Sequence, residues 1–313
     1  MPPFGQDNNG ASSATRSILT PADRVVRADN GAITSFGSFE VQSDPTDILE
    51  GLGILFGVYG DGGNGKTTFI CSLADRKVNP DGLGLPMVVL DAEAGIKSVA
   101  HLVGDDLQRT RVKSFSDVER FVDTWEAQPR QHFPWKSVYL DNLSDMVQKA
   151  LEEQGFHNKA NTGPGMTSSQ PDYNAMTVRV TVCLQKIRDL ALDYNVNVFF
   201  SLWEYTEKTE SGQIIGYKAD LPPRLSNRVR GILDYVGYLA IVDNPPHFDR
   251  KLTFLPMDAN HRDLDAKVRI RRDEVAGQIP LEIYNPSMPD LLATLKGGKP
   301  FPVDRYRRRG VAK

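Results

Sequence analysis

The sequence has few cysteines and no long apolar run. Its 313 residues include two cysteines, Cys71 and Cys183, which argues against a disulfide-rich scaffold and a cysteine-based zinc site. Each lies in a segment with apolar periodicity, so we predict two buried free thiols. The longest apolar run covers residues 236–242, whereas a membrane-spanning helix needs roughly 18 residues. Together with an N-terminus unlike a secretory signal, this predicts a cytoplasmic protein with no membrane partner.

Several catalytic signatures are also missing. The five histidines show neither H-E-x-x-H nor another metal-binding spacing. No G-x-S-x-G nucleophile elbow occurs. The N-K-x-D signature of guanine-nucleotide binding is absent too, which favours ATP over GTP as a ligand.

The composition is that of a globular protein, with 40% hydrophobic and 25% charged residues. The net charge of −3 hides an asymmetry, because residues 296–313 carry +6 and leave −9 for residues 1–295. A basic tail on an acidic body indicates a polyanionic partner. A solvated tail that aids solubility is an equally good interpretation.

The chain order predicts an α/β fold. We divide the chain into a flexible N-terminal arm (1–47), a core (48–275) and a C-terminal extension with the basic tail (276–313). Within the core, apolar strands alternate with amphipathic helices, which predicts a mostly parallel central sheet flanked by helices. The expected strands are 54–59, 87–90, 111–115, 137–140, 196–202 and 235–242, with a hairpin strand at 251–255, and the expected helices are 66–76, 117–128, 144–153 and 173–194. Ser116 is a plausible cap for the second helix.

One motif carries the chemistry. Residues 60–67 read GDGGNGKT and match G-x-x-x-x-G-K-[ST] between an apolar strand and a helix. Glycines allow the backbone N–H groups to curl around phosphates, and the helix N-terminus adds positive charge. Lys66 would reach the β- and γ-phosphates, and the Thr67 hydroxyl would bind Mg²⁺. The predicted nucleotide-binding residues are Gly60, Asp61, Gly62, Gly63, Asn64, Gly65, Lys66, Thr67 and Thr68.

Two carboxylates complete the predicted site. The strand at 137–140 runs into Asp141, which would hold Mg²⁺ through its water shell; the alternative is a helix cap. Because Asn142 follows in place of glutamate, the pair departs from the AAA+ pattern. Glu93 follows the strand at 87–90 and is our candidate for the catalytic base. Asp91 is the second choice, and a salt bridge is the non-catalytic alternative.

This combination resembles the RecA-like recombinase core, and within it the short phage-encoded ATPases of the Sak-type single-strand-annealing group. The segments that carry the resemblance lie between residues 50 and 275 and read VYGDGGNGKTTF, VVLDAEAG, SVYLDNLSDM, PDYNAMTVRV, IRDLALDYNVNVFFSLWEY and LPPRLSNRVRGILDYVGYL. The resemblance implies ATP and Mg²⁺ as cofactors, water activation by Glu93, and location in the host cytoplasm if the chain is phage-encoded. Single-stranded DNA, a single-strand-binding protein and further copies of the chain, in a filament or ring, are the implied partners.

The resemblance also suggests accessory residues. At the end of the strand 196–202, Ser201 and Glu204 are possible γ-phosphate sensors, while Trp203 there is either part of the sensor or a packed aromatic. The basic strand at 267–272 would reach a neighbouring subunit's phosphate through Lys267, Arg269 and Arg271; a solvated strand face is the alternative.

DNA contacts would come from the loops 155–172 and 206–227 and from the tail. The candidates are Lys208, Lys218, Arg224, Arg305, Arg307, Arg308 and Arg309. Acidic residues in the segment 206–227 weaken the prediction for Lys208, Lys218 and Arg224. The arginines of the tail would bind phosphates without reading bases.

The sequence therefore predicts an ATPase that binds single-stranded DNA in phage-type recombination, by annealing or strand pairing. Two alternatives stay open. One is an ATPase motor of DNA replication or packaging, such as a helicase. The other is a nucleotide-gated DNA-binding module that does not hydrolyse ATP.

Overall fold

The computed structural model of the chain describes residues 25–27, 33–36, 39–40, 53–159, 170–244, 247–268, 279–296 and 300–306. It separates into two units, Met1–Ile48 and Leu49–Lys313. In the first unit, β1 (Val25–Arg27), β2 (Ile33–Phe36) and β3 (Phe39–Glu40) form a three-stranded antiparallel sheet. These strands lie within the segment that we predicted as an arm.

The second unit is built on a nine-stranded sheet in the order β15-β12-β11-β4-β8-β7-β5-β6. The parallel part comprises β11 (Tyr235–Asn244), β4 (Leu55–Tyr59), β8 (Asn197–Leu202), β7 (Ser137–Asp141), β5 (Met87–Asp91) and β6 (Leu107–Arg111). Three antiparallel strands extend it at the β11 side: β12 (His247–Thr253), β14 (Lys267–Val268) and β15 (Glu282–Tyr284). The predicted mostly parallel α/β sheet is confirmed.

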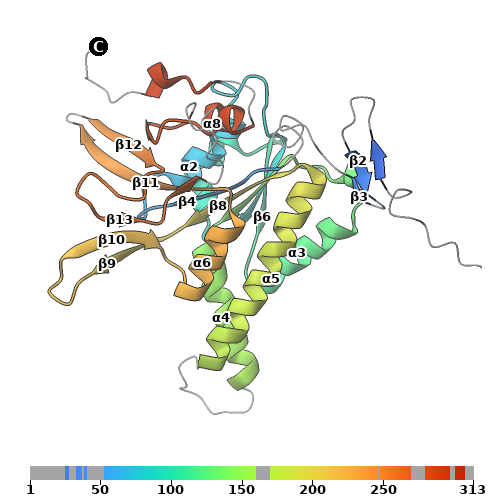
Figure 1. Cartoon of the computed structure of the whole chain (residues 1–313), viewed down its shortest axis with the longest axis horizontal. Helices are drawn as coiled ribbons and strands as arrows, with labels where there is room; N and C mark the ends of the chain where they lie inside the picture. Colours follow the sequence, from blue (N-terminus) through green and yellow to red (C-terminus); the bar gives the residue numbers. More distant parts are fainter. Residues whose placement is uncertain are drawn as a thin grey trace, which may run out of the picture. The chain divides into compact units, whose positions relative to one another are not determined.

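Helices cover both faces of this sheet (Figure 1). One face packs against α3 (Phe115–Ala127), α4 (Leu143–Lys159), α5 (Gln170–Tyr194) and α6 (Pro223–Ile232). The other packs against α2 (Lys66–Cys71), the 3-10 segments η2 (Ser72–Ala74) and η3 (Gly95–Leu102), and α8 (Met288–Leu295). In β4, Leu55 and Tyr59 face the first layer while Phe56 and Val58 face the second, as the strand period of two requires.

The α5 helix buries the apolar stripe that its sequence periodicity predicts. Its apolar stripe, including Met176, Val180 and Ile187, is buried in the core, whereas Val178 and Val182 are exposed. Both cysteines are buried and free, as predicted. None of the described helices has the length and apolar character needed to span a bilayer.

Several expected elements are wrong in position. The strand expected at 111–115 lies at Leu107–Arg111 as β6, because this edge strand is mostly exposed and has no apolar alternation to reveal it. The α3 helix then begins at Phe115 with Ser114 as its cap, not Ser116, and Ser114 and Asp117 form a reciprocal capping box. The helix expected at 66–76 ends at Cys71 and continues as the 3-10 turn η2.

The segment 206–227 is not a loop. It contains β9 (Glu204–Lys208) and β10 (Ile214–Ala219), which form a hairpin, and the start of α6. The strand β13 (Asp263–Leu264) adds to β10 to complete a small sheet. The remaining short elements are η4 (Arg130–His132) and η5 (Val303–Tyr306). Polar, half-exposed strands of this kind form through tertiary pairing, not through a local apolar pattern.

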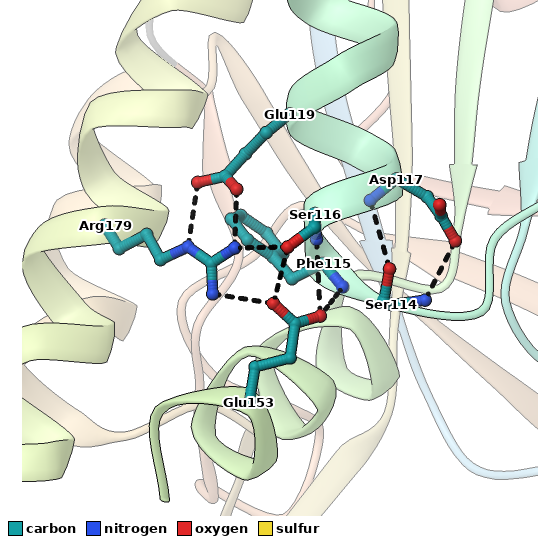
Figure 2. Close-up of polar contacts among 7 residues, drawn as sticks. All are labelled: Ser114, Phe115, Ser116, Asp117, Glu119, Glu153 and Arg179. Atoms are coloured by element: carbon teal, nitrogen blue, oxygen red, sulfur yellow. Dashed lines mark hydrogen bonds and ion pairs between the residues drawn. The ribbon is translucent and has the colours of Figure 1, made fainter. Parts of the chain in front are cut away.

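Arg179 ties the α3, α4 and α5 helices together (Figure 2). From α5, its guanidinium binds Glu119 of α3 through two N–H groups at 2.8 and 2.5 Å, and Glu153 of α4 at 2.8 Å. Glu153 also accepts the backbone N–H of Phe115 at 2.5 Å and the hydroxyl of Ser116 at 2.9 Å. Burial alone would raise the pKa of Glu153, but the hydrogen bonds from Arg179 and Ser116 outweigh it and lower that pKa.

We expect Arg179→Ala to destabilise the protein by about 2 kcal/mol, because it removes several charge-assisted hydrogen bonds and leaves two carboxylates side by side. Arg179→Lys, which keeps the charge but not the planar fork, should recover only part of this loss. Since the pKa of Glu153 is lowered by folding, the stabilisation is present above its unfolded pKa and disappears as the pH falls through the lower, folded value. Urea unfolding at pH 7 and at acidic pH measures both effects; an equal loss at both would contradict this account.

Candidate active site

The predicted site residues gather at the carboxyl ends of the parallel strands. The phosphate-binding loop follows β4, Glu93 follows β5, and Asp141 ends β7, with Ser201 near the end of β8. These four strands are neighbours in the sheet order. Ligands bind at this edge of open α/β sheets because the loops after the strands converge there.

The loop conformation depends on its glycines. Gly63 and Gly65 have φ values of 82° and 87°, which side chains with a Cβ rarely adopt. A Cβ on Gly60 would lie 2.2 Å from the Leu239 carbonyl oxygen of β11, so the backbone approaches that strand closely. The Asn64 side chain donates to the same carbonyl at 2.9 Å. The loop is therefore anchored on its β11 side.

The Lys66 ammonium lies inside this loop. It donates to the backbone carbonyls of Gly60 at 2.7 Å and Asp61 at 3.0 Å, and the residue is only 9% exposed. Burial lowers the pKa of Lys66, while the negative charges of Glu93 and Asp141 oppose that shift. The ammonium is thus held inside the loop, where it could bind a phosphate.

Asp141 is the centre of a hydrogen-bonded cluster. Its Oδ2 accepts the Thr67 hydroxyl at 3.0 Å, and its Oδ1 accepts the hydroxyls of Tyr139 at 2.8 Å and Ser201 at 2.6 Å. The carboxyl is almost completely buried, and burial raises the pKa of Asp141 although the three hydroxyl donors counteract this. Ser201, a sensor candidate, is therefore bound to Asp141.

These oxygens fit a magnesium ion. Mg²⁺ in phosphate-binding sites takes a hydroxyl, a carboxylate through water, and phosphate oxygens. A Cβ on Gly95 would lie 2.6 Å from Asp141 Oδ2 and 3.2 Å from Thr67 Oγ1, so the absence of a side chain there leaves the space beside both oxygens open. Among the described residues, no group of three or more His, Cys, Asp or Glu side chains could hold a metal without a phosphate.

Glu93 lies beside this cluster. Its Oε1 accepts the Asn142 side-chain N–H at 2.7 Å, and its carboxyl also hydrogen-bonds with Trp203. Partial burial, together with the charges of Asp141 and Asp145, raises the pKa of Glu93 to about 7. A carboxylate with a pKa near the working pH is suited to accept a proton from water.

This shift predicts a pH dependence. A general base must be ionised, so we expect kcat/KM for ATP to fall about tenfold per pH unit below pH 7 and to level off above it. ATP itself titrates in this range, and the comparison with Glu93→Gln removes that contribution because it affects both proteins. The ratio of wild-type to variant kcat/KM should therefore show the pKa. A ratio that stays constant between pH 5.5 and 8.5 would assign the proton to another group.

The other candidates have different neighbours. Asp91, the second choice for the base, is fully buried and bound to Arg109 of β6 at 2.6 Å, which agrees with the salt-bridge alternative. Glu204 accepts the Tyr238 hydroxyl at 3.0 Å. The Lys267 ammonium donates to the carbonyls of Arg230 and, at 3.0 Å, Leu233, at the C-terminal end of α6. Arg269 and Arg271 lie outside the described residues.

The four DNA-contact candidates that the structure describes lie on four different elements. Lys208 and Lys218 lie on β9 and β10, and Lys218 pairs with Glu207 at 2.5 Å. Arg224 on α6 bonds the Asn174 side chain at 3.3 Å, and Arg305 in η5 pairs with Asp290 at 3.5 Å. Arg307, Arg308 and Arg309, and most of the 155–172 segment, lie outside the described residues.

A groove of about 920 Å³ opens between the small sheet and the helices α4, α5 and α6. Trp203 lines this groove and also hydrogen-bonds with the Glu93 carboxyl. Its carboxylates outnumber its basic groups, and both bases already pair with carboxylates, Lys218 with Glu207 and Arg230 with Asp265. This excess of negative charge disfavours a phosphate backbone there.

Sequence reasoning missed three contributors. Tyr139 lies within the apolar strand β7, so nothing local marks its hydroxyl as a partner of Asp141. Asn142 contacts Glu93, which comes from a neighbouring strand. Arg250 of β12 donates its Nε–H to the Asn64 carbonyl in the phosphate-binding loop at 3.0 Å. This arginine is separated from the loop by most of the chain, and no motif includes it.

A family model described as "AAA domain" matches residues 53–270. Among solved structures, the chain is similar to a KaiC-like protein from the hyperthermophilic archaeon Pyrococcus horikoshii OT3, at 13% identity and a TM-score of 0.38, over 65% of this chain and 78% of that one. No curated protein matches the chain.

The AAA domain model covers the Asp141–Asn142 pair, in which asparagine stands where the AAA+ pattern predicts glutamate. The carboxylate that could activate water is Glu93, which follows β5, and Asn142 donates to it at 2.7 Å.

Proposed function

Because the chain belongs to the AAA domain family, we propose that it hydrolyses ATP with Mg²⁺ and that this cycle serves single-stranded-DNA binding in recombination. One observation carries the proposal. A loop lysine, a hydroxyl–carboxylate pair fit for Mg²⁺ and a carboxyl with a pKa of about 7 converge at one sheet edge. That combination is what phosphoryl transfer to water requires.

Each residue has a distinct task in the proposed reaction. The loop N–H groups and Lys66 bind the phosphates, and Thr67 and Asp141 hold Mg²⁺, which supplies charge neutralisation on the phosphate oxygens. Glu93 orients a water molecule and takes its proton. Asn142 and Trp203 fix the direction of the Glu93 carboxyl through their hydrogen bonds.

The nucleic-acid role is supported by the resemblance and by the basic tail. Binding of single-stranded DNA by a positively charged tail would be electrostatic and salt-dependent. In this proposal a single-strand-binding protein and further copies of the chain, in a filament or ring, are the protein partners, and the site of action is the cytoplasm.

Steady-state ATP hydrolysis tests the proposal. We expect wild-type turnover to rise on addition of single-stranded DNA and to lose that stimulation as salt increases. Heparin serves as the control polyanion. Equal stimulation by heparin would indicate a general polyanion effect, and turnover indifferent to DNA would remove the nucleic-acid role while keeping the ATPase. No turnover under any condition, with ATP still bound, would favour the nucleotide-gated binding module.

A further inference from the structure

We propose that Arg250 is a positioning residue that holds the phosphate-binding loop in its binding conformation from outside. This inference rests on the proposed function, because it concerns the same ATP site. It starts from the hairpin of β11 and β12, in which Ile241 pairs with Arg250. This hairpin lies beside β4, the strand that leads into the loop.

The Arg250 guanidinium lies directly against the loop. Its Nε–H donates to the Asn64 carbonyl at 3.0 Å. A Cβ on Gly65 would come within 2.4 Å of Arg250 Nε, so the glycine leaves room for the arginine as well as adopting a positive φ. The arginine and the loop backbone are thus packed without an intervening side chain.

Through the Asn64–Gly65 peptide bond, this contact sets the direction of the Gly65 N–H. In a trans peptide the C=O and the N–H point in opposite directions, and the Asn64–Gly65 bond is not among the cis bonds of the described chain. Drawing the Asn64 carbonyl outward toward Arg250 therefore turns the Gly65 N–H inward. Inward N–H groups are the part of such loops that binds the α- and β-phosphates.

The backbone of Arg250 is itself fixed. Its N–H donates to the Asn285 side-chain oxygen at 3.0 Å, and its carbonyl accepts the Asn285 N–H at 2.6 Å. The Asn285 side chain also donates to Asp249 at 2.8 Å. Because Arg250 is held by β11 on one side and by Asn285 on the other, its side chain starts from a rigid position.

Its charge is also available. The side chain is exposed, and within the described part of the chain no carboxylate forms an ion pair with it. An uncompensated cation behind the Asn64–Gly65 peptide adds an attraction for a polyphosphate. Arg250 therefore orients the Gly65 N–H and adds positive charge beside the phosphate-binding loop.

Calorimetric titration of Arg250→Ala with ATP, ADP and AMP tests the inference. We expect the Kd for ATP and ADP to rise about tenfold, because a charge-assisted hydrogen bond is lost. The Kd for AMP should change less, since AMP lacks the β-phosphate, one of the two phosphates that the inward N–H groups of such loops bind. KM for ATP should rise while kcat at saturation stays close to wild type. Arg250→Lys, which keeps the charge, should recover part of the affinity.

Lys251→Ala is the matched control. It removes a cation one residue further along β12, where the side chain points to the opposite face and pairs with Glu282 at 2.8 Å, and it should leave nucleotide affinity unchanged. A folded Arg250→Ala with wild-type ADP affinity would overturn the inference, and so would an equal loss for ADP and AMP. Failure of the wild type to bind ATP would instead overturn the proposed function.

Discussion

Lys66→Ala is expected to lower ATP turnover by about 10²- to 10³-fold, because it removes the ammonium that lies inside the phosphate-binding loop. The Lys66 ammonium already occupies the concavity, where it donates to the Gly60 and Asp61 carbonyls. On ATP binding these bonds would be exchanged for bonds to phosphate oxygens, which carry full charges and make stronger acceptors. The loss should therefore appear in both ATP affinity and kcat.

Loop collapse is the competing explanation for this result. Since Lys66 also binds the loop's own carbonyls, its removal could disorder the loop without any phosphate contact being involved. Amide hydrogen exchange of residues 60–67 separates the two, because a collapsed loop would exchange faster, whereas the melting temperature reports on the core and should stay near wild type in either case. Unchanged turnover in a folded Lys66→Ala protein would remove the site assignment.

Glu93→Gln is expected to reduce kcat by about 10²- to 10⁴-fold while ATP binding remains. The amide has the shape of the carboxylate and keeps one acceptor oxygen for the N–H donors Asn142 and Trp203, but it cannot accept a proton from water. The bound phosphates face Lys66 and the loop, and these are unaffected. Single-turnover hydrolysis and equilibrium binding of ATP, measured on the same protein, give the two quantities separately.

Asp91→Asn is the matched variant for Glu93→Gln. It makes the same carboxylate-to-amide change two residues earlier, at the end of β5, where the side chain is fully buried and paired with Arg109. We expect that change to lower stability, because it removes the charge of a buried carboxylate that pairs with the exposed Arg109, and to leave the chemical step intact. If Asp91→Asn abolishes turnover in a folded protein and Glu93→Gln does not, the base is Asp91.

Local patterns identify the parts of the site that are contiguous in sequence. The loop from Gly60 to Thr67 needs glycines at fixed positions and a lysine at its end, so its spacing alone marks it. Asp141 and Glu93 come directly after buried apolar strands, and the ends of parallel strands meet at one edge of a sheet. The fold class, these residues and the long helix α5 could therefore be predicted from the sequence.

Contacts between distant segments escape such patterns. Arg250 meets Asn64 only because β11 and β12 lie beside β4, and Asn142 meets Glu93 only because β7 lies beside β5. Exposed strands such as β6, β9 and β10 have no apolar alternation to mark them, and they exist through pairing with neighbours. Sheet neighbours are chosen by the packing of the whole chain, not by the residues next to each strand.

The sequence by itself determined which groups this protein brings to its candidate site: a loop of the phosphate-binding pattern, a hydroxyl and a carboxylate suited to Mg²⁺, and a second carboxylate that follows another strand. The tertiary structure decided how these groups act. It surrounded Asp141 with three hydroxyl donors, raised the pKa of Glu93 to about 7 and placed an arginine behind the loop. The reason is physical, since proton affinity and loop orientation depend on burial and neighbouring charge, which only the folded sheet creates.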